Sequence, residues 1–307
     1  MKRTTLKIFA LSALAASGLF AAQANAAEPM PVVASFSILG DLVKVVGGER
    51  VAVTTLARPN ADAHEFTPSP EHAKAVLGAK LFVVNGLSFE PWAQKLAQSA
   101  GYKGETVVAS KGVQPRQMAA EAGYPNDTSH AESDPHAWQN PLNGVQYVNN
   151  IAAGLAKADP SGAAIYQANA AAYAQQLKDF DAQAKTQFDA ITPAKRKVIT
   201  SHDAFGYLAA RYGITMLAPE GVSTDSEPSA KHVAQLIRQI KREKIKAVFM
   251  ENMSNPKLIE QLSKDAGVSV GATLYSDALS ETSGPAPTYL KMMQHNVTQL
   301  VSGMRLN

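Results

Sequence analysis

The sequence predicts an α/β protein made of two (β/α) lobes, each with a mostly parallel four-stranded sheet, joined by one long connecting helix. Short β-branched runs alternate with amphipathic segments, which is typical of parallel strands covered by helices on both faces of the sheet. One long segment without Gly or Pro divides these strands into two groups of about four. The chain has 307 residues, a length that suits two domains better than one.

The N-terminal end of the chain is typical of a secretory signal peptide. Lys2, Arg3 and Lys7 supply its positive charge, residues 8–20 form a short apolar core, and Ala24-Asn25-Ala26 is a small-x-small cleavage site. A membrane anchor needs roughly 20 apolar residues, more than this stretch offers. We therefore expect cleavage after residue 26 and no membrane insertion afterwards.

The mature chain that remains has no net formal charge. The full sequence has 29 basic and 26 acidic residues, and the signal peptide contains three of the basic ones and none of the acidic ones. No basic patch with interleaved aromatic residues is present either. These features argue against nucleic acid and acidic lipid as partners.

The sequence contains no cysteine. Disulfides, thiolate metal ligands and cysteine nucleophiles are therefore excluded. The acylated cysteine that tethers a bacterial lipoprotein is missing as well. We expect a soluble, periplasmic, monomeric protein.

Eight short runs are predicted as strands, and helical patterns lie between them. The strands are residues 31–37, 51–57, 81–86 and 106–110, followed by 196–201, 214–218, 246–251 and 271–275. The helical patterns include residues 39–46, 70–77, 205–211 and 230–243. Ser69 before Pro70 and Ser229 before Ala230 are N-cap signals for two of these helices.

The segment from Ala163 to Ala190 is predicted to form one long helix. It is rich in helix-favouring Ala, Gln and Lys, and Leu177, Phe180 and Phe188 give it a partial apolar stripe. A helix fixes the relative position of two lobes, which a Gly/Ser linker does not. The expected organisation is a signal peptide (1–26), an N-terminal lobe (27–160) that ends after an irregular loop (111–141), a connecting helix (161–192) and a C-terminal lobe (193–307).

Four polar residues follow predicted strands or the irregular loop and form a candidate metal site. They are His64, His136, His202 and Asp277. Two or three of the four lie just beyond the carboxyl ends of predicted strands, where open α/β sheets bind ligands. Three imidazoles and one carboxylate form a tetrahedral set that suits Zn²⁺. Because the four are far apart in the chain, only the folded protein can assemble this site.

Each of these residues also has a structural alternative. A histidine at a strand end is more often a surface or capping residue, and Asp277 alone is more often a turn or N-cap residue. Spacing by itself does not decide between the two interpretations. The remaining histidines His72, His232 and His295 are expected on solvated faces.

Three further residues are possible auxiliaries of the site. His130 lies in an acidic loop six residues before His136, so it is either a solvated loop residue or a transient metal contact. Glu65 and Glu227 are acids near the candidate ligands. Each is expected to be a helix-terminus residue or a hydrogen-bond partner of a ligand.

Seven short motifs occur in order along nearly the whole mature chain. They are ASFSILGD (34–41), HEFTPSP (64–70), NGLSFE (85–90, with Trp92 beyond it), DPHAW (134–138), SHDAFGY (201–207), SEPS (226–229) and YSD (275–277). In these motifs the chain resembles the metal-specific solute-binding proteins of bacterial ABC importers for zinc and manganese.

The resemblance implies that the metal is cargo, held in a cleft between two lobes and passed to a membrane permease. His64 and His136 would bind it from the N-terminal lobe, and His202 and Asp277 from the C-terminal lobe. Manganese-preferring members often have Glu where this chain has His202, and imidazole suits zinc, so Zn²⁺ is the expected metal and Mn²⁺ the alternative. Zinc members commonly have a His-rich loop before the second ligand. Here that loop contains only His130, so we expect no strong metal reservoir in it.

Two other functions fit parts of the sequence. A secreted zinc hydrolase needs an open coordination position and a general base, but no HExxH motif occurs and four side chains would fill the site. A binding protein for a chelated metal or a vitamin needs a wide, aromatic-lined cleft, which Trp92, Trp138, Phe205 and Tyr207 would have to provide. We expect a binding protein rather than an enzyme, in which the connecting helix limits the lobes to a small rotation.

Overall fold

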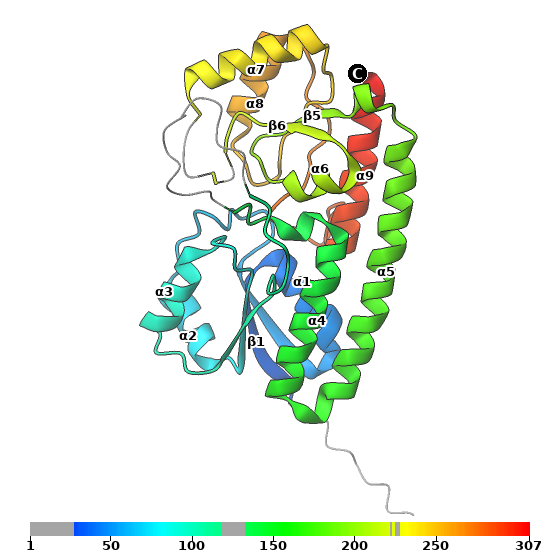
Figure 1. The fold of residues 1–307 in the computed structure, drawn as a ribbon. Helices are drawn as coiled ribbons and strands as arrows, with labels where there is room; N and C mark the ends of the chain where they lie inside the picture. Colours follow the sequence, from blue (N-terminus) through cyan, green and yellow to red (C-terminus); the bar gives the residue numbers. More distant parts are fainter. Residues whose placement is uncertain (1–27, 118–132, 222, 225–227) are drawn as a thin grey trace, which may run out of the picture.

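The computed structural model describes residues 28–117, 133–221, 223–224 and 228–307, which form two lobes with a long helix beside both (Figure 1). The signal peptide expected over residues 1–26, and both His130 and Glu227, lie outside the described residues. In the described part of the chain, no helix is long and apolar enough to cross a membrane.

The first lobe contains a four-stranded parallel sheet, as predicted. Its spatial order is β2 (Val51–Ala57), β1 (Met30–Phe36), β3 (Leu81–Val84) and β4 (Glu105–Val108), and α1 (Ser37–Gly47), α2 (Pro70–Gly78) and α3 (Pro91–Ser99) connect the strands. Val32 in β1 pairs with Val53 on one side and Leu81 on the other. Because helices cover both faces of the sheet, its central strand is apolar along most of its length.

The second lobe repeats this strand order in a less regular form. β5 (Lys197–Ile199) pairs in parallel with β6 (Thr215–Leu217), and single parallel bridges join Ile199 to Val248 and Val248 to Val270. The connecting helices are α6 (Gly206–Tyr212), α7 (Ala230–Glu243) and α8 (Pro256–Ala266). In both lobes the second segment therefore lies at one edge of the sheet, followed by the first, third and fourth.

The predicted strands 246–251 and 271–275 form only isolated bridges and not regular strands. Gly271 lies against the ring of Phe249, and a Cβ built at Gly271 would be 2.9 Å from Cε1 of that ring. A glycine in a strand offers no side chain to pack and marks a close backbone approach. The backbone N–H of Gly271 still donates to the carbonyl oxygen of Val248 (2.7 Å), so the two segments pair here, but in an irregular ladder.

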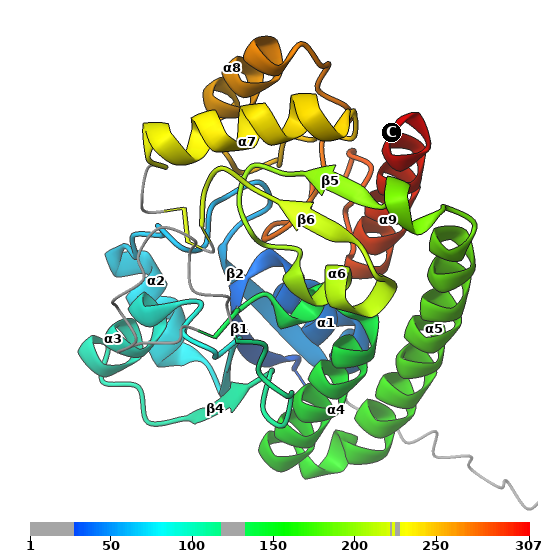
Figure 2. The same ribbon diagram turned by 45° about the horizontal axis from the view of Figure 1, so that its top comes forward.

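The long helix predicted over 163–190 is α5 (Ala163–Asp189), which lies along both lobes (Figures 1 and 2). It packs on α1 and α4 (Pro141–Ala158) of the first lobe and on α6 and α9 (Tyr289–Leu306) of the second. Asp181 on α5 accepts hydrogen bonds from Nε of Arg211 (2.8 Å) and from the Tyr212 hydroxyl (3.0 Å), both on α6. These bonds fix the second lobe to the helix.

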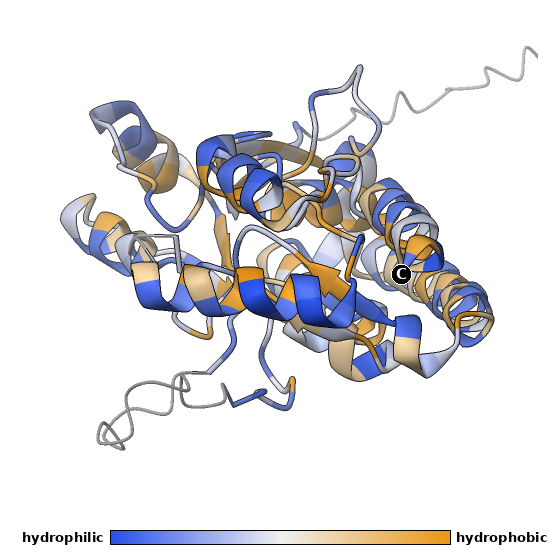
Figure 3. Cartoon of the chain, turned by 90° about the horizontal axis from the view of Figure 1, so that it is seen from above, coloured by the Kyte–Doolittle hydropathy of each residue, from blue (hydrophilic) through white to orange (hydrophobic). Residues whose placement is uncertain are grey.

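One hydrophobic core runs through both lobes. Phe36 and Trp138 from the first lobe belong to the same buried cluster as Phe205 and Leu279 from the second. Smaller clusters lie beneath α2 and α3 and beneath α7 and α8, and Figure 3 shows the alternating hydrophobic and hydrophilic stripes of α7 from above. A continuous core resists wide separation of the lobes.

Candidate metal site

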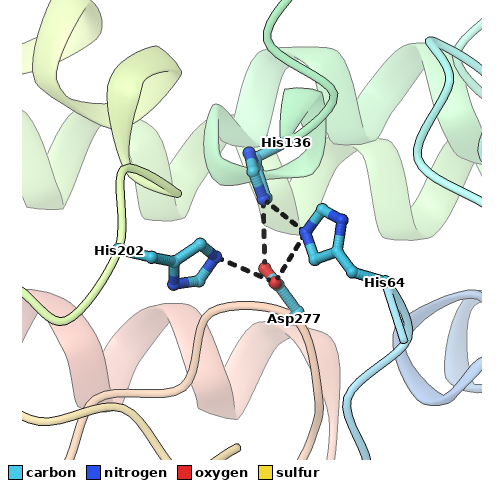
Figure 4. Close-up of side chains that lie close together, drawn as sticks. All are labelled: His64, His136, His202 and Asp277. Carbon is cyan, nitrogen blue, oxygen red and sulfur yellow. Dashed lines mark hydrogen bonds and ion pairs between the residues drawn. The ribbon is translucent and has the colours of Figure 1, made fainter. Parts of the chain in front are cut away.

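Four side chains from separate parts of the chain meet between the two lobes (Figure 4). They are His64, His136, His202 and Asp277, the four residues that the sequence analysis selected as candidate ligands. One nitrogen or oxygen atom from each lies within 4.8 Å of the corresponding atom of every other. The structure therefore brings together the complete candidate set.

The strand ends explain why these residues meet. His64 lies in the loop between β2 and α2, and His202 lies shortly after β5. Asp277 follows the parallel bridge at Leu274, and His136 immediately precedes a short 3₁₀ helix (Ala137–Gln139). The carboxyl ends of parallel strands share one edge of a sheet, and here those edges of the two sheets face each other.

The interatomic distances match those of a small tetrahedral site. Nε2 of His64 lies 3.2 Å from Nε2 of His136 and 3.3 Å from Oδ2 of Asp277. Nε2 of His202 lies 3.1 Å from Oδ2 of Asp277, and Nε2 of His136 lies 3.6 Å from Oδ1 of Asp277. Four ligands bound at ~2.0–2.1 Å in a tetrahedron lie about 3.3–3.4 Å apart. These four distances therefore lie close to the spacing of a tetrahedral zinc site.

The cluster is shielded from solvent. The side chains of His136, His202 and Asp277 are 0% exposed, whereas that of His64 is 6% exposed. His64 is therefore the member of the set nearest to solvent.

Two buried carboxylates orient two of the imidazoles. Oδ1 of Asp134 accepts the backbone N–H of His136 (3.0 Å) and lies 2.9 Å from its Nδ1. Oε1 of Glu251 accepts the backbone N–H of His202 (3.0 Å), and Oε2 lies 2.8 Å from its Nδ1. A carboxylate beside Nδ1 keeps the proton on that nitrogen and leaves the Nε2 lone pair for a metal.

Sequence reasoning did not assign a role to Asp134 or Glu251. Asp134 belongs to the DPHAW motif, and Glu251 is the last residue of a predicted strand. These two features of the sequence could have marked both residues as candidate partners of the ligands. The pairing of Glu251 with His202 spans 49 residues and depends on tertiary structure. Glu65, named as a possible auxiliary, has an exposed side chain and is not part of the cluster.

Hydrogen bonds between the lobes hold Asp277 beside His136. The carbonyl oxygen of Ser276 accepts from Nε1 of Trp138 (2.9 Å) and from Nε2 of Gln139 (2.9 Å). All three partners are buried. The peptide that precedes Asp277 is therefore fixed to the residues that follow His136.

The charges of the cluster shift the pKa values of its members. Burial lowers the pKa of His136, but Asp277 and Asp134 beside it raise this pKa overall, to about 9. Burial also lowers the pKa of His202, but Glu251 and Asp277 raise it well above its usual value. Burial raises the pKa of Asp277, yet His136 and His202 hold it well below its usual range. Without a metal, His136 and His202 therefore carry protons and pair with the carboxylates.

Comparisons with known proteins give a consistent result over nearly the whole chain. The family model described as zinc-uptake complex component A, periplasmic, matches residues 32–303. The manganese-binding lipoprotein MntA of Halalkalibacterium halodurans is 32% identical over 277 residues, which cover 90% of this chain and 89% of that protein. The iron-binding protein YfeA of Yersinia pestis is 31% identical over 279 residues, which cover 91% of this chain and 88% of that protein.

A solved structure with the same fold is the periplasmic zinc-binding protein TroA from Treponema pallidum. It matches with a TM-score of 0.83 and 27% sequence identity, covering 90% of this chain and 99% of that chain. The similar proteins are thus named for manganese, iron and zinc.

Proposed function

We propose that this chain, which belongs to the family of the periplasmic zinc-uptake complex component A, captures Zn²⁺ and delivers it to the permease of an ABC importer. The family consists of substrate-binding proteins for divalent metals and not of enzymes, so the resemblance drawn from the motifs and the expectation of a non-enzyme are confirmed. The identity of the metal and of its ligands is our proposal.

The observation that supports zinc best is the composition of the buried cluster. Its donors would be Nε2 of His64, His136 and His202 and the carboxylate of Asp277, at distances that suit a tetrahedral ion. Imidazole nitrogen suits Zn²⁺, whereas Mn²⁺ prefers more carboxylate oxygen. His202 stands where manganese-preferring members of the family often have a glutamate, and its imidazole therefore favours zinc over manganese.

The charges around the cluster also suit a dication. Asp277, Asp134 and Glu251 place three carboxylates in or beside it, and Nη1 of Arg116 lies 3.0 Å from Oδ2 of Asp134. This excess of carboxylates favours a cation at the centre of the cluster. In the metal-free protein, Asp277 and its neighbouring carboxylates raise the pKa values of His136 and His202, so protons on these imidazoles take the place of the cation.

Capture would need only a small movement of the lobes. Each lobe contributes two of the four ligands, while the common core and α5 hold the lobes together. We propose that release depends on loosening the ligands of one lobe rather than on wide opening. On the same grounds, we propose that the mature chain divides into an N-terminal lobe (27–160), a connecting helix (161–192) and a C-terminal lobe (193–307).

The chain is expected to act in the periplasm after cleavage of residues 1–26. Several relatives are named as lipoproteins, but this sequence has no cysteine to acylate. We therefore propose a mature protein that is not tethered by a lipid and that meets its permease by diffusion, as a monomer.

Metal analysis of protein recovered natively from the periplasm, without added metal, tests this proposal. We expect about one zinc ion per chain and only traces of manganese and iron. Zinc outcompetes manganese for most sites in vitro, so affinity measured in a buffer would not decide the cargo. Protein that contains mainly manganese or iron would contradict the assignment of zinc.

A further inference from the structure

His64 is held differently from the other two histidines of the cluster. Asp134 and Glu251 lie beside Nδ1 of those two, but among the described residues no carboxylate contacts Nδ1 of His64. Its ring packs edge-on against Phe89, with ring centroids 4.6 Å apart and 72° between the ring planes. His64 also lies in a loop without regular structure. Its position therefore depends on what holds this loop.

Asp62 connects the loop to the opposite lobe. Its Oδ1 accepts the backbone N–H of His64 (2.8 Å), and its Oδ2 accepts the hydroxyl of Thr224 (2.6 Å). Thr224 lies 162 residues further along the chain, in the second lobe beyond β6. A single carboxylate thus links the backbone of a candidate ligand to the other lobe.

A separate contact anchors the start of the same loop. The backbone N–H of Asn60 donates to the carbonyl oxygen of Leu279 (3.0 Å), and its Oδ1 accepts from Nδ2 of Asn252 (2.9 Å). Asn60 has a φ of 58°, a left-handed conformation that Asn adopts more readily than most residues. Since this anchor does not involve Asp62, loss of the Asp62–Thr224 bond should free His64 without releasing the whole loop.

We propose that Asp62 and Thr224 form an interlobe latch that positions His64 on the metal and sets the rate at which the ion leaves. This inference rests on the proposed function. When the second lobe moves away, Asp62 loses Thr224, one of its three hydrogen-bond partners, and can then move together with the backbone of His64. His64 then leaves the metal first, because the other two histidines keep their buried carboxylates.

The test compares Thr224→Val with Thr224→Ser in the mature, zinc-loaded protein. Valine keeps the shape of threonine without its hydroxyl, whereas serine keeps the hydroxyl. We expect the valine variant to release zinc about tenfold faster, the effect of one lost hydrogen bond to a carboxylate, while its association rate changes by less than about twofold. The serine variant should behave as the wild type. Stopped-flow mixing with a chelating dye measures the dissociation rates.

A matched control and a second readout separate the latch from a general loss of structure. Thr54→Val changes an exposed threonine on β2 and should leave zinc release unchanged. In metal-free protein, amide hydrogen exchange over residues 58–66 should become faster in Thr224→Val than in Thr224→Ser.

Two results would overturn the latch. One is a zinc dissociation rate in Thr224→Val equal to that of the wild type. The other is an equal increase in the valine and serine variants, which would show that the hydroxyl is not involved. A wild-type protein that binds no zinc would instead overturn the proposed function, so the two failures are distinguishable.

Discussion

Replacing His202 by alanine should lower the affinity for Zn²⁺ by at least about 100-fold. Four protein ligands together contribute on the order of 10–16 kcal/mol to zinc binding, so one of them accounts for about 3 kcal/mol, which corresponds to about two orders of magnitude. The substitution also leaves Glu251, which is 2% exposed, without the imidazole that it contacts. Competition with a chelator of known affinity measures the change.

His232→Ala is the matched control for this experiment. His232 is exposed on α7, its Nε2 lies 3.0 Å from the carbonyl oxygen of Ala218, and it is not a member of the cluster. This variant should bind zinc as the wild type does. Thermal unfolding of both metal-free variants shows whether the fold is intact. An unchanged zinc affinity in a folded His202→Ala protein would remove His202 from the ligand set.

Zinc affinity should fall steeply as the pH is lowered from about 8 to about 6. The pKa of His136 is raised to about 9 and that of His202 is raised well above its usual value, so both imidazoles carry a proton at neutral pH. Zinc needs the Nε2 lone pair and must displace these protons. Each displaced proton costs about tenfold in affinity per pH unit, so two protons cost about 100-fold per unit.

Calorimetry in buffers of different ionisation enthalpy measures this proton release directly. We expect about two protons per zinc ion at neutral pH, which keeps the charge of the buried cluster constant when a dication binds. Zinc binding without proton release would contradict the ion-paired arrangement of the metal-free cluster.

The same pKa shifts fix the sign of the stability change in the metal-free protein. A histidine with a raised pKa contributes stability that is complete below about pH 6.5, and for His136 this contribution is lost as the pH rises through about 9. Asp277 has a lowered pKa, so its contribution is present above about pH 4 and is lost at lower pH. Added zinc should therefore stabilise the fold more strongly at pH 8 than at pH 6.

The sequence pattern predicts the layout of the fold well wherever local chemistry determines it. The composition of 163–190, without Gly or Pro, is sufficient to locate α5, and β-branched runs locate the parallel strands of the first lobe. The segments predicted as strands over 246–251 and 271–275 form only isolated bridges, because regular pairing depends on how two distant segments align and not on the β-branched pattern of either one.

The candidate site, like the fold, has one part that the sequence predicts and one part that depends on tertiary structure. Its four residues are visible in the motifs, but the partners that orient them are not. Glu251 lies beside His202, and Thr224 bonds Asp62, only because the two lobes pack together. Side chains separated by 49 and 162 residues leave no local periodicity from which such pairs could be found.

Diffraction from zinc-loaded crystals, with anomalous data collected at the zinc absorption edge, tests the central claim most directly. The account predicts one strong peak between the lobes, about 2.0–2.2 Å from Nε2 of His64, His136 and His202 and from the carboxylate of Asp277. A main peak elsewhere in the molecule would contradict it. So would an ion held by only three of these residues, with water in an open fourth position.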